Sequence, residues 1–259
     1  MGTAWAGLRL AVGTLTMIPV GSLPPTTRRI GAWAMALAPI AALPLGLLVA
    51  AVGRLGQAAA MPTSITATLS VGALALATRA MHLDGLADTA DGIGAGWDRE
   101  RALRVLRTGD VGPMGVMALV VVVLLQSACA TALLSLAHGW LLVGVAVVAS
   151  RVAATLGCLR VLPTASGSSL GAVVAGTVPG VVGGPAVVVT GAALTGATVV
   201  AGLQWWQGVA AMAALLVAVA WLLRSAVRVF GGINGDVLGA SIEVGTAALL
   251  VALTIGATA

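Results

Sequence analysis

The chain has 259 residues, of which 59% are hydrophobic and only 8% charged. Soluble domains carry about 25% charged residues, so this chain has too little charge to cover a water-soluble globule of its size. A soluble enzyme, a nucleic-acid-binding domain and a disordered chain are therefore excluded, and no nucleic acid partner is expected. The composition indicates one integral membrane domain over residues 1–259, embedded in a lipid bilayer.

Apolar stretches long enough to cross a bilayer recur along the whole chain, since a span needs about 20 mostly apolar residues. They lie at 30–52, 64–81, 113–136, 140–159, 181–203, 208–223 and 242–258. The segment 4–20 is also apolar around Arg9, and its pattern fits an interfacial, a re-entrant or an additional spanning segment. The pattern predicts an all-α polytopic helical bundle with about seven transmembrane helices, in a range of roughly six to eight.

The arginines predict the orientation of the chain. Threading seven spans places eleven of the 13 basic residues on one side of the membrane, with Arg54 on the other and Arg151 inside a span. By the positive-inside rule, the arginine-rich side faces the cytoplasm. We therefore expect a multi-pass protein of the cell (inner) membrane, and the pattern is compatible with a homo-oligomer.

All eight acidic residues fall in two stretches of that side, 82–115 and 224–245. In the first, Asp84, Asp88 and Asp91 follow the spacing i, i+4 and i+7, which places three carboxylates on one helical face if the second span continues through them. Carboxylate oxygens suit Mg²⁺, or Mn²⁺, with positions left for phosphate oxygens. A solvated acidic helix end is the alternative. Gly92 and the glycines after it are expected to break the helix and let backbone approach a ligand.

Residues 97–115 add basic groups and another carboxylate. Arg101, Arg104 and Arg107 recur at helical spacing, and arginine forks bind phosphate in a bidentate manner. A basic juxtamembrane helix touching anionic lipid explains them equally well. Asp110 lies at a Gly/Pro-rich turn before the next span, where it can fold back as a further metal ligand or as a proton acceptor.

The segment 224–245 supplies Asp236 and Glu243, interpreted as substrate-binding groups. For Asp236 a helix N-cap is equally compatible with the spacing. His82 is a further candidate for substrate binding, although a lone histidine at a helix end more often only hydrogen-bonds. Arg151 is a candidate because intramembrane charges are usually functional, with snorkelling to the interface as its alternative.

The sequence resembles the cobalamin synthase family, the adenosylcobinamide-GDP ribazoletransferases. The resemblance is carried by LTMIPVG at 15–21, by the block HLDGLADTADGIGAGWDRERALRVLRTGDVGPMGVMALV at 82–120, and by GGINGDVLGASIE at 231–243. Within the block at 82–120, the pattern Asp88-x-x-Asp91-Gly92-x-x-Ala95 also looks like the opening of the CDP-alcohol phosphotransferase signature. Gly96, however, stands where that signature has arginine.

The resemblance implies a Mg²⁺-dependent membrane phosphotransferase that completes the nucleotide loop of cobamides. It would transfer adenosylcobinamide phosphate from adenosylcobinamide-GDP to α-ribazole, or to α-ribazole 5′-phosphate, and release GMP. On this view Asp88, Asp91 and Asp110 are the catalytic candidates. A phospholipid synthase of the CDP-alcohol phosphotransferase type is the alternative, and a cation-coupled transporter is a third. Transporters place their carboxylates near the bilayer centre, whereas here they lie at span ends.

Overall fold

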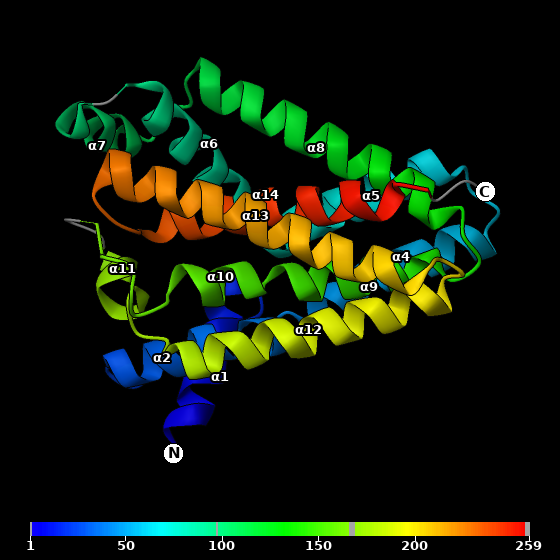
Figure 1. Ribbon diagram of the computed structural model, residues 1–259, viewed down its shortest axis with the longest axis horizontal. Coiled ribbons are helices and arrows are strands. Elements are labelled where there is room, and N and C mark those ends of the chain that lie inside the picture. Colours follow the sequence, from blue (N-terminus) through cyan, green and yellow to red (C-terminus); the bar gives the residue numbers. More distant parts are fainter. Residues whose placement is uncertain (1, 97, 166–168, 257–259) are drawn as a thin grey trace.

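The computed structural model describes residues 2–96, 98–165 and 169–256, which fold into an elongated bundle of helices (Figure 1). The described residues contain no β-strand, only two isolated bridges. The first helices are α1 (Thr3–Leu15), α2 (Arg28–Ala36), α3 (Ala38–Ala41), α4 (Leu43–Ala58), α5 (Thr63–Ala77), α6 (Met81–Gly94) and α7 (Arg99–Thr108). They are followed by α8 (Pro113–Leu134), α9 (Gly139–Ser150), α10 (Val152–Gly157), α11 (Ser169–Val174), α12 (Gly180–Val200), α13 (Trp205–Phe230) and α14 (Gly235–Thr254).

Five apolar helices are long enough to cross a membrane: α8, α9 continuing into α10, α12, α13 and α14. The short helices α5 and α6 count as a sixth span only if taken together, across a bend of 88°. The all-α membrane bundle is thus confirmed, with fewer uninterrupted spans than the predicted seven. The expected span 30–52 is instead the broken run α2–α3–α4, because Pro39 and Pro44 each begin a new helix.

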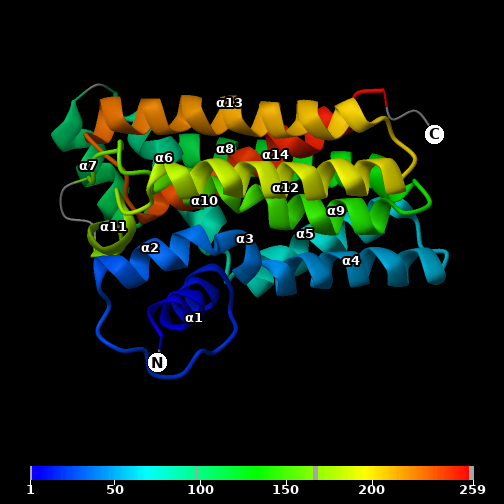
Figure 2. The same cartoon turned by 60° about the horizontal axis from the view of Figure 1, so that its bottom comes forward.

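The N-terminal helix α1 lies beside the bundle, against α2 (Figure 2). It is 13 residues long and therefore too short to cross a bilayer by itself. The chain leaves it through an extended segment, 17–27, before α2 begins.

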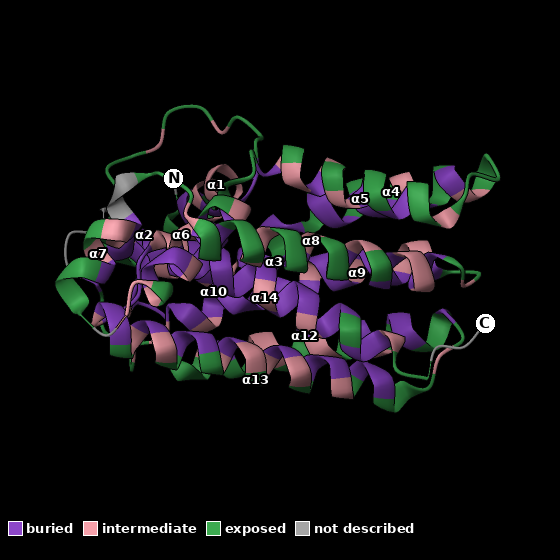
Figure 3. Cartoon of the chain, turned by 90° about the horizontal axis from the view of Figure 1, so that it is seen from above, coloured by how far each residue is buried: buried purple, intermediate pink, exposed green. Residues whose placement is uncertain are grey.

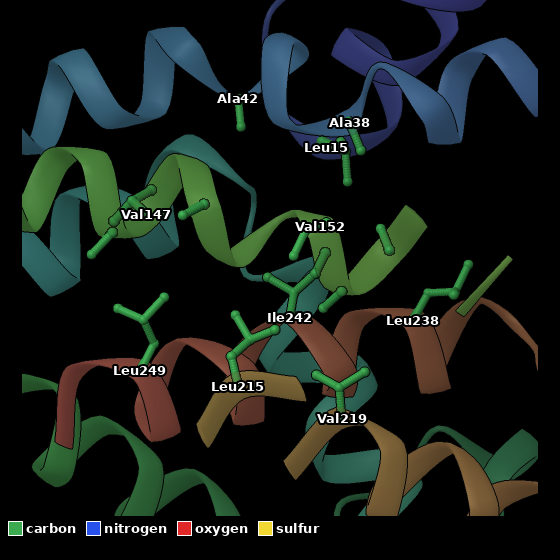
Figure 4. Close-up of a cluster of buried hydrophobic side chains, with 14 of the residues drawn as sticks. Leu15, Ala38, Ala42, Val147, Val152, Leu215, Val219, Leu238, Ile242 and Leu249 are labelled. Carbon is green, nitrogen blue, oxygen red and sulfur yellow. The ribbon is translucent and has the colours of Figure 1, made fainter. Parts of the chain in front are cut away.

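Helix α14 is the central element of the bundle. Most of its residues are buried, and it packs against α6, α8, α9, α10 and α13 (Figure 3). Ile242 of α14 lies between Val152 of α10 and Val219 of α13 in the core (Figure 4). Burial on every side explains why this helix carries glycine, alanine and serine wherever a neighbour comes close.

The connections gather at the two ends of the bundle (Figures 1 and 2). One end holds α7, α11 and the α13–α14 turn, and the opposite end holds the turns 59–62, 135–138 and 201–204. The loops that the arginine count places together are therefore together in the structure.

Two expectations about how the helices connect are corrected by the structure. The expected loop from 224 to 241 is the end of α13, a four-residue turn, and the start of α14. Arg224 and Arg228 are exposed, so their charges do not end α13; the helix ends at Gly231, whose φ of 80° favours glycine. The expectation that α5 continues straight into α6 is also wrong, because Arg79 and Ala80 adopt left-handed conformations at the bend.

Candidate active site

The three aspartates of the first acidic segment lie on α6, at the end of the bundle that carries α7. The one-face spacing holds although α6 is a separate helix, because all three residues fall within its bounds. Their environments differ: Asp84 is exposed, Asp88 is half-buried, and Asp91 is only 8% exposed. The face therefore runs from solvent into the protein.

Helix α14 adds Asp236 to this face through a very close helix–helix contact. A Cβ built on Gly85 would lie 2.7 Å from the carbonyl oxygen of Asp236, so only glycine permits this approach. Asp88 lies outside the five spanning helices, and partial burial together with the charges of Asp84, Asp236 and Asp91 raises its pKa to about 6. The carboxylates therefore repel one another, and a cation among them would relieve the repulsion.

Asp236 does not cap α14. The N-cap is Asn234, whose side-chain oxygen accepts a hydrogen bond from Val237 N at 2.9 Å. Asn234 Nδ2 also donates to Asp236 Oδ2 at 2.8 Å, which holds the carboxylate in the first turn of the helix. The capping interpretation of Asp236 is therefore wrong.

Asp91 has a structural role that its spacing did not reveal. Its carboxylate accepts hydrogen bonds from Gly112 N at 2.7 Å and from Gly115 N at 2.9 Å, so it caps the N-terminus of α8 from another helix. A Cβ on either glycine would lie within 2.6 Å of a carboxylate oxygen. Two of the three glycines of the segment TGDVGPMG, Gly112 and Gly115, are thus explained by the close approach of Asp91.

Asp110 is exposed, two residues before the Gly112 amide that binds Asp91. Within the described residues, no three His, Cys, Asp or Glu side chains are close enough to form a metal site on their own. The donor chemistry of Asp84, Asp88 and Asp236 nevertheless fits a hard divalent cation, which prefers oxygen ligands and usually keeps several waters or substrate phosphates.

The predicted arginine face of α7 lies at the protein surface where its side chains are described. Arg101 and Arg104 are exposed, and Arg104 Nη1 lies 3.8 Å from Glu100 Oε2 in a surface pair of little energetic value. The side chain of Arg107 is outside the described part of the structure. Helix α7 instead buries Ala102 and Leu106 toward its neighbours α6 and α13.

Arg99 is the arginine that sequence reasoning missed. A Cβ on Gly231 would lie 2.9 Å from Arg99 Cζ, so the guanidinium rests on the turn between α13 and α14, a few residues before Asp236. The signal was present in the sequence: Arg99 shares a helical face with Ala102 and Leu106, the residues that dock α7.

The remaining candidates lie inside the protein. Gly92 is within α6, where a Cβ would meet the ring of Phe230 at 2.8 Å, so it does not break the helix and serves close packing. His82, Arg151 and Glu243 are buried among the helices, 5%, 0% and 6% exposed. They form a group of their own, deeper in the bundle than the exposed Asp84.

Fold and site together define a polytopic α-helical membrane protein with an acidic site at one end of its bundle. Residues 7–254 match the family model described as cobalamin-5-phosphate synthase. The chain is 45% identical over 254 residues to an adenosylcobinamide-GDP ribazoletransferase of a Nocardioides species, covering 97% of this chain and 98% of that protein. Proteins of the same name from Frankia casuarinae (40% identity, 95% and 94% covered) and Bradyrhizobium diazoefficiens (36%, 95% and 92%) are also similar. No solved structure matches the chain.

The chain belongs to the cobalamin-5-phosphate synthase family. This confirms the resemblance stated from the segments at 15–21, 82–120 and 231–243, all of which lie within the matched residues. It also makes the chain a membrane transferase of cobalamin biosynthesis, in preference to a phospholipid synthase or a transporter.

Proposed function

We propose that this enzyme transfers adenosylcobinamide phosphate from adenosylcobinamide-GDP to the ribose hydroxyl of α-ribazole or its 5′-phosphate. The products are GMP and adenosylcobalamin or its 5′-phosphate. Family membership supports the reaction. The observation that carries the site is the contact of α6 with α14 at Gly85, which brings the first turn of α14, with Asp236, against the helix that carries Asp84 and Asp88.

In the proposed reaction, the ribazole 3′-hydroxyl oxygen attacks the phosphorus that bears cobinamide. A new P–O bond forms, and the anhydride P–O bond to GMP breaks in line with it. A carboxylate accepts the hydroxyl proton, and we assign this role to Asp110, because it is exposed and lies on the connection anchored at Asp91. Arg99, on the turn before Asp236, is placed to bind the diphosphate.

Mg²⁺ is part of this proposal, with Mn²⁺ as a substitute. Asp84, Asp88 and Asp236 would hold it, with Asp91 contributing charge while it caps α8. When bound, the ion supplies positive charge that neutralises the diphosphate and the leaving phosphate. The carboxylates themselves position the ion and orient the substrate.

The site is proposed to face the cytoplasm, where nucleotide substrates are found. Support comes from the arginines gathered at the same end of the bundle, of which Arg28, Arg99, Arg160 and Arg228 are exposed examples.

The test uses the purified full chain in proteoliposomes with adenosylcobinamide-GDP, α-ribazole 5′-phosphate and Mg²⁺. GMP is quantified by chromatography and the cobamide product is weighed by mass spectrometry. We expect equal amounts of both, none without the ribazole substrate, and loss of both with a chelator. GMP formed without a joined product would refute the transfer. Unchanged turnover after chelation would refute the metal alone.

A further inference from the structure

A buried polar group joins four helices in the interior of the bundle. It consists of His82 on α6, Gln126 on α8, Arg151 between α9 and α10, and Glu243 on α14, which we call the Glu243 network. These side chains are 5%, 2%, 0% and 6% exposed. Charged residues are costly in the interior of a membrane protein and are seldom retained without a function.

Glu243 is the centre of the network. Its Oε2 accepts a hydrogen bond from Gln126 Nε2 at 2.7 Å, and its Oε1 lies 4.0 Å from His82 Nδ1. Arg151 is the nearest buried positive charge to Glu243 and His82, and it acts on them at longer range than an ion pair. The central helix is therefore hydrogen-bonded to α8 through Gln126 and has His82 of α6 within 4.0 Å of its carboxylate.

Arg151 is itself held in place from one side. Its Nη1 donates to Val147 O at 3.0 Å and to Ser150 Oγ at 2.9 Å. Its Nε and Nη2, like both ring nitrogens of His82, have no hydrogen-bond partner among the described residues. The network therefore keeps polar atoms of two helices facing the interior without direct hydrogen-bond partners among the described residues.

The contact between α6 and α14 brings the two backbones close, and the described residues show no backbone hydrogen bond between them at these positions. Their contact is made at glycines: a Cβ on Gly85 would meet the backbone of Asp236 at 2.7 Å, and one on Gly239 would meet His82 Cα at 3.1 Å. Small-residue surfaces allow close approach, but apolar contact has no preferred direction. A buried, directional polar contact is the best-attested device for specifying the register of packed helices.

We propose that the Glu243 network sets the rotation and register of α14 against α6, and so places Asp236 beside Asp84 and Asp88. Glu243 and Arg151 are then positioning residues that do not touch substrate. His82 precedes Asp84 by two residues, and Glu243 follows Asp236 by two helical turns, so each of the two helices carries both a site carboxylate and a network member. This role rests on the proposed function of the carboxylate site.

The test is the double variant Arg151→Met/Glu243→Gln, which removes both charges and leaves an oxygen to accept from Gln126. Removing two opposite buried charges together is tolerated far better than removing one and leaving the other uncompensated. We expect the melting temperature to stay near that of the unmodified protein. We expect kcat for GMP release to fall on the order of a hundredfold, as for a misplacement of about 1 Å, with KM little changed.

A distance measurement provides a readout that does not depend on activity. Nitroxide labels at Met81 on α6 and Val251 on α14, both exposed, report the relative placement of the two helices by pulsed electron paramagnetic resonance. The labels are introduced in a background without the two buried cysteines. We expect a narrow distance distribution in the otherwise unmodified protein and a broader or shifted one in the double variant.

The matched control is Gln57→Leu, at the opposite end of the bundle. Gln57 Nε2 donates to Leu134 O and Leu136 O, both at 3.0 Å, so the variant loses a polar link between helices that is remote from the site. It should lower thermal stability and leave kcat and the label distances unchanged. If the double variant does not fold, Glu243→Asp keeps the charge but shortens its reach, and it should lower kcat in the same direction.

Three outcomes overturn the proposal. Unchanged kcat and distances in the double variant would make the network structural only. A raised KM with unchanged kcat would mean that Arg151 binds substrate directly. A narrow, unshifted distance distribution in the double variant would overturn the positioning role whether or not the unmodified protein releases GMP. Absence of GMP release by the unmodified protein would refute the proposed function instead.

Discussion

Asp88→Asn and Asp91→Asn are expected to differ sharply in stability, although the two aspartates are one turn apart on α6. The carboxylate of Asp91 accepts two backbone N–H bonds at the start of α8. Asparagine offers one acceptor oxygen, and its NH₂ group would face the other N–H. Hydrogen bonds to a charged group contribute about 1.5–3 kcal/mol, and an unsatisfied buried donor costs a further ~1–3 kcal/mol.

For Asp91→Asn we therefore expect a loss of about 3 kcal/mol in the free energy of unfolding, allowing for relaxation around the site. At about 2–4 °C per kcal/mol for a chain of this size, the melting temperature should fall by roughly 6–12 °C. Asp88 makes no side-chain hydrogen bond to the described residues, and partial burial together with its neighbours' charges raises its pKa. Removing its charge relieves repulsion, so metal-free Asp88→Asn should be as stable as the unmodified protein or slightly more stable.

The assay is thermal unfolding in detergent, with and without Mg²⁺, beside GMP release. At a free concentration a hundred times Kd, a bound ion adds about 2.7 kcal/mol, which the unmodified protein should show and Asp88→Asn should lose. Both variants should lose most turnover. Glu100→Gln should keep it, because Glu100 is exposed on α7. An Asp91→Asn protein that melts like the unmodified one would refute the capping argument, and an active Asp88→Asn protein would refute the metal site.

Asp236→Ala should lower turnover strongly and change the melting temperature little, because the helix cap is a different residue; a destabilised, fully active variant would remove Asp236 from the site. Arg99→Ala should raise KM for adenosylcobinamide-GDP about tenfold or more, the loss of a charge-assisted contact, whereas Arg104→Ala should leave KM unchanged; equal effects would argue against a specific role for Arg99. In a cysteine-free background, Arg104→Cys should be shielded from an impermeant thiol reagent added outside intact cells and His138→Cys should react; the reverse pattern would invert the membrane orientation.

The regular part of the site could be predicted from the sequence. Helical spacing alone places Asp84, Asp88 and Asp91 on one face, and this required only that α6 be a helix. Hydropathy and the arginine distribution likewise predicted an all-α bundle and the grouping of its loops.

The contacts between helices could not be predicted in the same way. The two donors to Asp91 come from residues 21 and 24 positions away, and periodicity carries no information on such distances. The bend before α6 depends on left-handed Arg79 and Ala80, residue types that seldom adopt this conformation. Arg224 and Arg228 suggested a loop because charge normally marks the end of a span, but α13 simply continues past them.

The length of α13 determines how deep the site lies in the bilayer. Trp205 and Trp206 are exposed at its start, where aromatic side chains anchor a helix at the lipid headgroups. A hydrocarbon core of about 30 Å corresponds to ~20 helical residues, which brings the opposite boundary close to Arg224. The last turn of α13 and Asp236 then lie among the headgroups, where a bulky hydrophilic substrate can bind without entering the hydrocarbon core. Turnover should therefore depend on acyl-chain length, because thicker bilayers would draw these residues toward the hydrocarbon.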